Sequence, residues 1–376
     1  MPDNATPQTP DSGTLPHTLN PVSSRLYVRP LGIQWGPPPS GVDTVPFAGG
    51  RAWFSWAELA VRSSCDIHRY RVPTMALRAW ADGIGAWAAE RVGSFFRAYR
   101  NGLEPFAGLA LDRPRLMGVI NVTPDSFSDG GETLSAEAAV ARARAMSAAG
   151  ADILDIGGES TRPGAAPVAE AEELSRALPV VTPLAAEGRL VSIDTRNAVV
   201  MRAATAAGVR IVNDVSAATH DPAALAAIAE SGASVVLMHA SGDPRTMQND
   251  PRYDDAALDV FDYLEARVGA AIAAGIPRRS ILIDPGIGFG KTVEHNRAIL
   301  SAIALYKGLG VGVLLGVSRK SFIGRIAGAT NPKDRLPGSL ALLLHGFDQG
   351  VDVVRVHDVT ESAQALALWR AVRNDS

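Results

Sequence analysis

The sequence predicts an α/β fold, a (β/α)8 TIM barrel, that follows an N-terminal extension containing helices. One observation is a repeated pattern in which an alanine-rich run ends at a glycine and a short apolar run follows, as at Gly150, Gly208, Gly232 and Gly350. Glycine readily adopts the left-handed conformation that ends a helix, and apolar runs without alternation are typical of parallel strands buried on both faces. The other observation is that eight such apolar runs occur, each with room for a helix after it, as a (β/α)8 barrel requires. A doubly wound open sheet is the alternative fold.

The eight expected strands are short. They are Leu116–Ile120, Ile153–Ile156, Leu190–Ile193, Ile211–Val212, Ser234–Met238, Ile281–Ile283, Val313–Leu315 and Val353–Val356. Polar or ionisable side chains lie where these strands end, and they are Asn121, Asp155, Asp194, Asn213, Asp214, His239, Asp284, Ser318, Arg319 and His357. In a barrel the carboxyl ends of the strands converge on one mouth, where active sites lie, so we expect these groups to share one site. The alternative is that they cap the helices that follow.

Composition and charge restrict the class of protein. The 376 residues suit one large domain with an appendage, and the apolar content of 47% is sufficient for a packed core. A formal net charge of −3 gives no indication of a nucleic-acid partner. The single cysteine, Cys65, excludes an intramolecular disulfide and a cysteine-rich zinc site. We see no signal peptide and no run of roughly 18 apolar residues that would span a membrane, so we expect a cytoplasmic protein.

The composition divides the chain into three segments. Residues 1–24 are rich in Pro, Thr, Ser and Asn, and we expect them to be disordered. Residues 25–110 contain five of the six tryptophans and have apolar residues at helical spacing, which predicts one or two amphipathic helices. Residues 111–376 contain the barrel pattern. We expect the extension, residues 25–110, to dock on the barrel by its apolar helix faces; a membrane surface or a partner helix is the alternative.

The loops after the first two strands combine glycines with hydroxyl and charged groups. These loops are Asn121–Gly131 and Gly157–Gly164. Long loops of this composition are typical of mobile lids over a site. Arg162 is suited to hold an anion by two hydrogen bonds, unless it is a solvated surface arginine.

The loop after the sixth strand, Asp284–Thr292, contains three glycines and a lysine. Pro285 occupies the position where a phosphate-binding loop requires glycine, so we do not predict nucleotide binding. The glycines instead suit close passage of the backbone beside a flat ligand, with Phe289 next to it.

The loops after the last two strands are cationic, which is common where such barrels hold phosphate groups. The residues concerned are Ser318, Arg319, Lys320, Arg355 and His357. Because His239 and His357 lack the spacing of zinc ligands, we do not expect zinc held by the protein. Mg²⁺ carried on a substrate diphosphate is the cofactor that this end of the site favours.

Eight sequence runs resemble the dihydropteroate synthase family and occur in that family's order between about residues 115 and 365. They are MGVINVTPDSFSDGG, DIGGESTRPGA, IDT, VNDVSA, LMHASGDPRTMQ, DPGIGFGKT, GVSRKSFIG and RVHDV. The resemblance implies a transferase of folate biosynthesis that condenses a dihydropterin methyl diphosphate with 4-aminobenzoate. The extension matches no part of that family's barrel. A pterin-dependent methyltransferase and a non-catalytic pterin-binding paralogue are the alternatives.

The resemblance also implies roles for individual residues. The pterin would be held by Asp194, Asn213, Met238, Asp284, Phe289 and Lys320. The diphosphate would be held by Asn121, Asp155, Arg162, Arg355 and His357, with Asn121 also binding Mg²⁺. The 4-aminobenzoate pocket would contain Phe127, Thr161, Pro163 and Ser321. The catalytic set would be Asp194, Asp284, Lys320, Arg355 and His357, and the family implies a homodimer.

Overall fold

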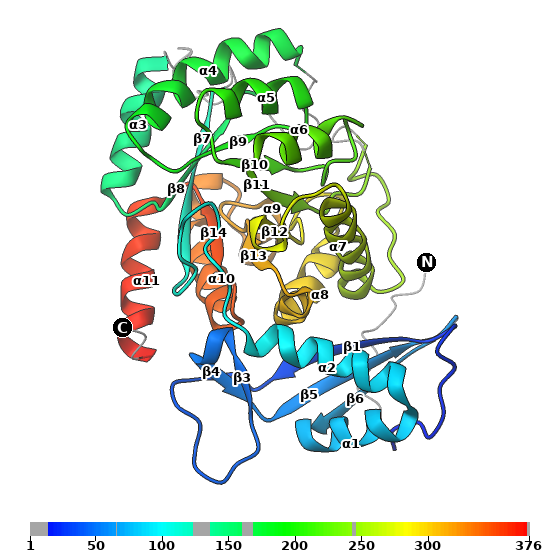
Figure 1. Cartoon of the computed structure of the whole chain (residues 1–376). Helices are drawn as coiled ribbons and strands as arrows, with labels where there is room; N and C mark the ends of the chain where they lie inside the picture. Colours follow the sequence, from blue (N-terminus) through cyan, green and yellow to red (C-terminus); the bar gives the residue numbers. More distant parts are fainter. Residues whose placement is uncertain (1–13, 65, 123–135, 160–167, 243–245, 374–376) are drawn as a thin grey trace.

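The computed structural model describes residues 14–64, 66–122, 136–159, 168–242 and 246–373. Eight parallel strands form a closed barrel in the order β10-β11-β12-β13-β14-β7-β8-β9 (Figure 1). The strands are β7 (Arg115–Asn121), β8 (Ile153–Gly157), β9 (Val191–Asp194), β10 (Ile211–Asp214), β11 (Ser234–Met238), β12 (Ile281–Asp284), β13 (Gly312–Leu315) and β14 (Val353–Val356). The predicted (β/α)8 barrel is confirmed, and the open-sheet alternative is wrong.

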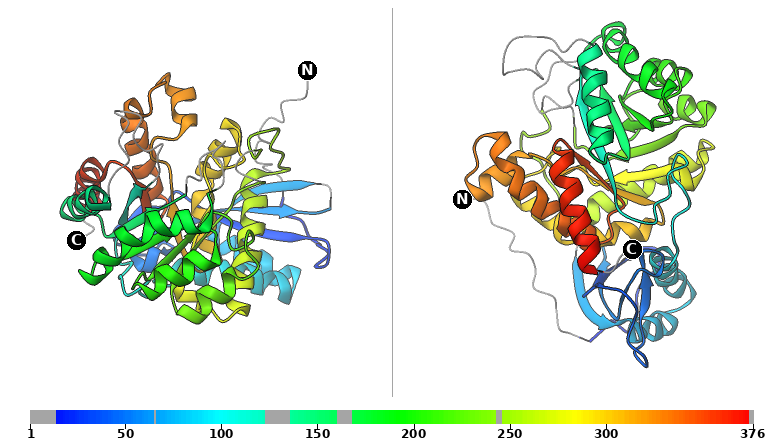
Figure 2. Two further views of the ribbon diagram at one scale, coloured as in Figure 1. Left: turned by 90° about the horizontal axis from the view of Figure 1, so that it is seen from above. Right: turned by 90° about the vertical axis from the view of Figure 1, so that its left-hand side faces the viewer.

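Helices surround the barrel, as two further views show (Figure 2). They are α3 (Ala136–Ala148), α4 (Glu170–Ala186), α5 (Ala198–Ala206), α6 (Ala224–Ser231), α7 (Ala256–Ala273), α8 (Val293–Ser301), α9 (Ser321–Ala327), α10 (Leu336–Asp348) and α11 (Val359–Arg373). Short 3-10 turns at Arg278–Ser280, Ile303–Leu309 (η4) and Pro332–Arg335 complete the connections. Within the described residues, no helix has the length and apolar character needed to cross a membrane.

The strand register aligns the expected site residues at one end of the barrel. Gly157 on β8 pairs with both Asn121 on β7 and Asp194 on β9. Asp194 in turn pairs with Asn213 on β10, and Met238 on β11 pairs with Asp284 on β12. Because paired residues in neighbouring parallel strands lie at the same height, these side chains reach the same mouth of the barrel.

The extension contains two small antiparallel sheets followed by two helices. One sheet has the order β1-β5-β6 and the other β2-β4-β3. Their bounds are β1 (Arg25–Leu31), β2 (Gln34–Trp35), β3 (Val45–Phe47), β4 (Ala52–Phe54), β5 (Trp56–Arg62) and β6 (Ile67–Pro73), with a 3-10 turn at Ala48–Gly50. The helices α1 (Thr74–Ile84) and α2 (Ala86–Arg100) confirm the helical prediction. The strands were not predicted, because β5 is buried along five consecutive residues and lacks alternation.

Part of the predicted disordered tail is packed. Leu15 and Leu19 lie against the hydrophobic core, and the indole Nε1 of Trp80 donates a hydrogen bond of 2.7 Å to the carbonyl oxygen of Pro16. The expectation of disorder for residues 1–24 is therefore wrong for residues 14–24, where two leucines among polar residues are enough to attach the segment. Residues 1–13 lie outside the described residues.

The extension packs against the amino-terminal end of the barrel and along α7 (Figure 1). The ring of Phe95 on α2 stacks on Phe261 of α7 at 5.6 Å, and a Cβ on Gly308 of η4 would lie 2.2 Å from the Phe95 ring. Trp35 meets Trp369 of α11 edge to face, with ring centroids 4.8 Å apart. The contact surface thus contains closely fitted aromatic side chains, which pack the extension and the barrel together.

The connection from the extension to β7 closes the bottom of the barrel. Phe106 and Leu111 pack against residues that the strands direct into the barrel interior. These interior residues are Met117, Ile153, Ile211, Val236, Leu282, Leu314 and Val353. Phe106 is fully buried and pairs with Leu109 through two backbone hydrogen bonds, so it fills the end of the barrel opposite the mouth.

We predict that Phe106→Ala lowers the free energy of unfolding by about 3–5 kcal/mol, because it leaves a cavity that strands from all sides of the barrel cannot fill. Denaturant unfolding measures this difference. Leu368→Ala is the control, since Leu368 is 64% exposed, and we expect it to change stability by less than about 0.5 kcal/mol. Equal effects of the two substitutions would contradict the assigned packing.

Candidate active site

Two buried carboxylates share one arginine at the barrel mouth. The Nε of Arg355 on β14 donates to Asp155 Oδ2 on β8 at 2.6 Å, and its terminal nitrogen donates to Asp194 Oδ2 on β9 at 2.6 Å. Asn213 on β10 donates its side-chain amide to the same Asp155 oxygen at 3.1 Å. Four predicted site residues from four strands therefore form one hydrogen-bonded group.

The second oxygen of each carboxylate has no donor among the described residues. The Oδ1 atoms of Asp155 and Asp194 are buried and have no hydrogen-bond partner among the described residues. A buried acceptor without a donor is costly, so these atoms are suited to a bound molecule that supplies N–H or O–H groups. Burial raises the pKa of Asp194 to about 7, against the opposing charge of Arg355 and with the carboxylate of Asp155 adding to the rise. Burial alone would lower the pKa of Arg355, but the two carboxylates raise it.

Asp284 provides a third carboxylate at the mouth. Its Oδ1 accepts a hydrogen bond of 2.7 Å from the backbone N–H of Gly286. Burial raises its pKa, while that N–H and the charges of Lys320 and Lys291 act in the opposite direction. A Cβ at Gly316 would lie 3.6 Å from Asp284 Oδ2, so the neighbouring strand leaves space beside this carboxylate.

The backbone of Gly286–Gly290, which we call the glycine loop, lies directly on the end of β11. A Cβ at Gly286 would be 1.8 Å from the carbonyl oxygen of His239, and one at Gly290 would be 2.7 Å from Ser241. Both glycines have positive φ angles, +67° and +62°. No other residue type fits these positions without displacement of the backbone, which explains the glycines noted in the sequence.

Hydrogen bonds fix the glycine loop from several sides. The Gly288 N–H donates to Asn296 Oδ1 at 2.7 Å, and its carbonyl accepts from Gln248 at 2.6 Å. The Gly290 carbonyl accepts from the hydroxyl of Tyr253 at 2.8 Å. The loop is therefore held in one conformation, and it carries Phe289, whose ring centroid lies 4.1 Å from the Nζ of Lys320. This cation–π contact confirms that two predicted pterin residues are neighbours.

Lys291 is a buried cation that sequence reasoning did not assign to the site. Its Nζ lies 2.8 Å from His239 Nδ1 and donates to the carbonyl oxygens of His239 at 3.3 Å and Phe289 at 3.0 Å. Burial lowers the pKa of Lys291 to about 7, and burial together with the Lys291 charge lowers the pKa of His239 to about 2. The neutral imidazole thus accepts from the lysine. The lysine's place directly after the glycines was the available signal.

The cationic residues after β13 and β14 do not all have the same surroundings, although the sequence grouped them together. His357 follows β14, with Nδ1 3.0 Å from Ser318 Oγ, and its backbone N–H donates to that hydroxyl at 3.1 Å. Arg319, however, pairs with Asp358 through Nε at 2.9 Å, so its charge is already partnered. Ser321 is exposed at the start of α9.

A second network lies at the base of the loop after β8. Glu159 is buried and accepts two hydrogen bonds from Arg196, at 3.0 and 3.1 Å. Glu173 is buried on α4 and accepts from Asn197 at 2.7 Å, and burial raises its pKa. These partners are far apart in the sequence, which is why the pattern alone did not identify them.

Four predicted site residues, Phe127, Thr161, Arg162 and Pro163, lie outside the described residues. Within the described part of the chain, no group of three or more His, Cys, Asp or Glu side chains is arranged to hold a metal ion. The side-chain oxygen of Asn121 would lie 3.6 Å from a Cβ at Gly157, on the strand next to Asp194. Its position at the mouth fits a single protein ligand for a metal that a substrate also binds.

Comparison with known proteins agrees with this geometry. A family model described as pterin binding enzyme matches residues 117–357. The dihydropteroate synthase of Escherichia coli strain K12 is 44% identical over 264 residues, which are 70% of this chain and 93% of that protein. The chain belongs to the dihydropteroate synthase family of pterin-binding enzymes.

Further members of the dihydropteroate synthase family are equally similar. The Synechocystis synthase is 46% identical, with 69% of this chain and 91% of that protein covered. The structure of the Xanthomonas albilineans synthase with 4-aminobenzoic acid is 48% identical, with a TM-score of 0.67, and covers 71% of this chain and 96% of that one. The Yersinia pestis synthase with a sulfonamide drug complex is 42% identical, with a TM-score of 0.68 and the same coverages. The extension precedes the part of the chain that the family model matches.

We predict that Asp194→Asn becomes more stable relative to the unsubstituted protein as the pH rises from about 4 to 7. The folded-state pKa of Asp194, about 7, is above the unfolded value near 4. Ionisation of this buried group therefore lowers stability across that interval, and the variant lacks the penalty. At about 1.4 kcal/mol per pKa unit we expect a relative change of about 1–4 kcal/mol.

Denaturant unfolding at pH 5 and pH 8 measures this difference, with Glu170→Gln, an exposed carboxylate replaced in the same way, as the control. A stability difference for Asp194→Asn that does not vary with pH would contradict the raised pKa.

Proposed function

We propose that the chain joins a 7,8-dihydropterin methyl diphosphate to 4-aminobenzoate and releases 7,8-dihydropteroate and diphosphate. The observation that carries this proposal is the set of three buried carboxylates around Arg355 and Lys320 at one barrel mouth. Solved relatives contain 4-aminobenzoic acid or 7,8-dihydropteroate, as their descriptions state. The chain covers 91–96% of the length of these and the curated relatives cited above, which supports transfer of their whole activity.

The pterin is recognised at the deep side of the mouth. Its amino-pyrimidinone edge presents adjacent N–H donors, which suit the carboxylate of Asp284. Its carbonyl and ring nitrogens accept hydrogen bonds from Lys320 and Asn213. The Oδ1 atom of Asp194, which has no partner among the residues described, accepts a further ring N–H. Met238 and Phe289 lie beside the ring and cover its apolar faces.

The diphosphate is bound at the cationic side of the mouth. Arg355 and His357 provide positive charge and hydrogen-bond donors, Asp155 orients Arg355, and Arg162 of the loop after β8 adds a second guanidinium. Asn121 would hold Mg²⁺ together with diphosphate oxygens, since Mg²⁺ commonly takes one or two protein oxygens and several from phosphate and water. Bound there, the ion would neutralise charge on the leaving group.

The reaction begins when the bond between the pterin methylene carbon and the diphosphate oxygen breaks, with the electron pair leaving on the diphosphate. The cation left on the pterin is favoured by the negative charges of Asp194 and Asp284. The amine nitrogen of 4-aminobenzoate then forms the C–N bond and loses a proton to solvent. An aromatic amine is neutral at pH 7, so its nucleophilic attack depends on orientation rather than on a general base.

The 4-aminobenzoate pocket uses Phe127, Thr161, Pro163 and Ser321. Three of these residues belong to the loops after β7 and β8, and closure of those loops would keep water from the cation. A sulfonamide has the shape of 4-aminobenzoate, and the Yersinia pestis relative is described with such a drug. We therefore expect sulfonamides to compete with 4-aminobenzoate here. The predicted homodimer and the cytoplasmic location are further parts of this proposal.

Turnover with the pterin diphosphate, 4-aminobenzoate and Mg²⁺ tests the function directly, and absence of dihydropteroate would contradict it. Methyl transfer to a corrinoid protein would instead support the methyltransferase alternative.

We predict that Lys320→Ala lowers kcat/KM at least about tenfold with an unchanged fold, because Lys320 contributes to the mouth and little to the core. Lys333→Ala, at an exposed turn, is the control. Normal turnover by Lys320→Ala would remove the assigned role.

We also predict that 4-aminobenzoate binds weakly to the free enzyme and at least about tenfold more tightly once diphosphate and Mg²⁺ are present. The reason is that these complete the site against which the two loops close. Isothermal titration calorimetry with and without diphosphate measures both affinities. The same affinity under both conditions would contradict ordered binding.

A further inference from the structure

We propose that the N-terminal extension controls the affinity of the pterin site by fixing the mouth end of α7, with Arg69 as the positioning residue. This inference rests on the proposed function, because it concerns the same pterin site. It does not require the extension to touch the substrate. The route runs from Glu58 through Arg69 to Asp255 by ion pairs, along the backbone from Asp255 to Tyr253, and then to the glycine loop by a hydrogen bond.

The route starts at Glu58, a carboxylate in the middle of β5 that is 5% exposed. Its Oε1 accepts from Arg69 on β6 at 3.0 Å and its Oε2 from Arg29 on β1 at 2.8 Å. Arg29 also donates to the carbonyl oxygen of Ser301, at the end of α8. A buried carboxylate between two guanidinium groups orients both of them, so Arg69 is held in position within the extension before it contacts the barrel.

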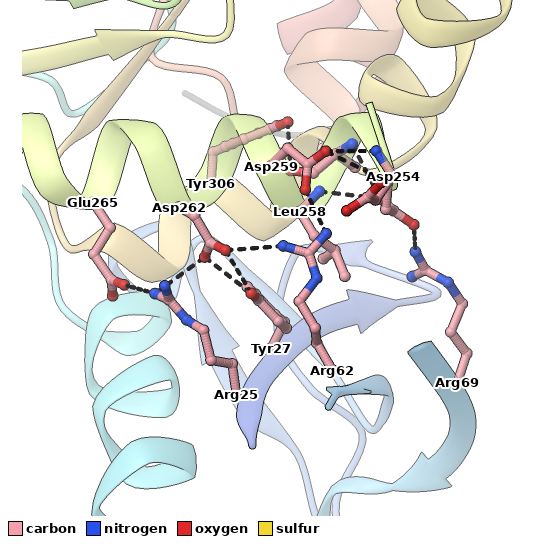
Figure 3. A network of polar contacts seen from close by, with 12 residues as sticks. Arg25, Tyr27, Arg62, Arg69, Asp254, Leu258, Asp259, Asp262, Glu265 and Tyr306 are labelled. Carbon is pink, nitrogen blue, oxygen red and sulfur yellow. Dashed lines mark hydrogen bonds and ion pairs between the residues drawn. The ribbon is translucent and has the colours of Figure 1, made fainter. Parts of the chain in front are cut away.

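Arg69 then reaches the first residues of α7. Its other terminal nitrogen pairs with Asp255, whose side chain also accepts the N–H groups of Ala257 and Leu258 as the N-cap of the helix. Arg62 pairs with Asp259 one turn later, and Asp259 accepts the backbone N–H of Asp254 at 2.9 Å. Figure 3 shows Arg62 and Arg69 reaching from the extension to this end of α7. The extension thus fixes both the cap and the first turn.

The segment just before α7 holds the glycine loop. Tyr253, two residues before the cap, donates to the Gly290 carbonyl at 2.8 Å, and Gln248 donates to the Gly288 carbonyl at 2.6 Å. The ring of Tyr253 also meets His295 of α8 edge to face at 4.8 Å. Phe289 lies between Gly288 and Gly290, and the Nζ of Lys320 lies 4.1 Å from the centroid of its ring. A shift of residues 253–255 therefore moves the wall of the pterin pocket.

A second set of ion pairs attaches the extension to the middle of α7, at Glu265, and supplies a matched control. Arg91 of α2 donates to Glu265 at 2.6 Å. Arg25 donates to the same residue, as Figure 3 shows. The Arg91 side chain is 27% exposed and that of Arg69 21%. Because α7 runs from the mouth towards the bottom of the barrel, Glu265 lies more than two turns further from the mouth than Asp255. Loss of Arg91 therefore removes a comparable ion pair without touching the route.

The first test compares Arg69→Ala with Arg91→Ala in the full-length protein. For Arg69→Ala we expect KM for the pterin diphosphate, and Kd for the pterin by calorimetry, to rise about three- to tenfold. We expect kcat at saturating substrate to stay within about twofold, because no group that touches the reacting atoms changes. Arg91→Ala should lower Tm to a similar degree with an unchanged KM and Kd. Unchanged pterin affinity in Arg69→Ala, or an equal loss in both variants, would overturn the proposal.

The second test is a double-mutant cycle with Tyr253→Phe. If Arg69 acts through Tyr253, the combined variant should lose no more affinity than the more affected single variant. If the fold-losses in pterin affinity of the two single variants multiply in the combined variant, the proposed route through Tyr253 is wrong. Arg69→Lys, which keeps the positive charge beside Asp255, should recover part of the affinity. The calorimetric arm separates this inference from the proposed function, since pterin binding can respond to Arg69 even in a protein that shows no turnover.

Discussion

Closure of the barrel brings acidic side chains from neighbouring strands together in a buried place, and Arg355 is the group that makes this arrangement tolerable. Asp155 and Asp194 are on adjacent strands, and two carboxylates there would repel each other strongly in a region of low dielectric constant. One guanidinium bonded to both leaves the Oδ1 atom of each carboxylate without a hydrogen-bond partner among the described residues. These two acceptors are suited to a ligand that donates hydrogen bonds.

The glycine loop, in contrast to these carboxylates, has its backbone polar groups supported by neighbouring segments. A flat heterocycle needs a rigid wall beside it, and several backbone groups of this loop are hydrogen-bonded to neighbouring segments. Donors and acceptors for it come from Asn296, Gln248 and Tyr253, while the absence of side chains at Gly286 and Gly290 lets it contact the end of β11 directly. The Nζ of Lys291 donates to the carbonyl oxygens of His239 and Phe289, and it thereby links the residues after β11 to the glycine loop. The site thus combines a rigid backbone wall with buried carboxylates, and this arrangement is preorganised to stabilise a developing cation.

The barrel and its strand-end residues could be predicted because each strand is a local apolar run and its functional residue follows directly in the sequence. The position of Asp194 at the mouth required only that the strands be parallel and closed, whereas the roles of Asp194 and Arg355 were implied by the family resemblance. Lys291 and the Glu159–Arg196 pair could not be predicted in this way, since their roles arise from contacts between segments that the sequence does not bring together. The strands of the extension were missed for a related reason. β5 is covered on both faces, and Glu58 is buried because arginines from two other strands surround it.

The geometry of a (β/α)8 barrel explains how an element attached outside the mouth can still affect it. Every helix of such a barrel begins near the mouth and runs back towards the bottom, so an element that packs along the outside of α7 can contact its first residues. The sheet β1-β5-β6 does this, with Arg25 on Glu265 near the middle of the helix and Arg69 on Asp255 at its N-cap. The relatives leave only 4–9% of their own length outside the match, and this chain leaves about 30%. The added segment is therefore a restraint that this chain places on a common site, and its effect should depend on the stiffness of the connection through Asp255 and Tyr253 rather than on any new contact with substrate.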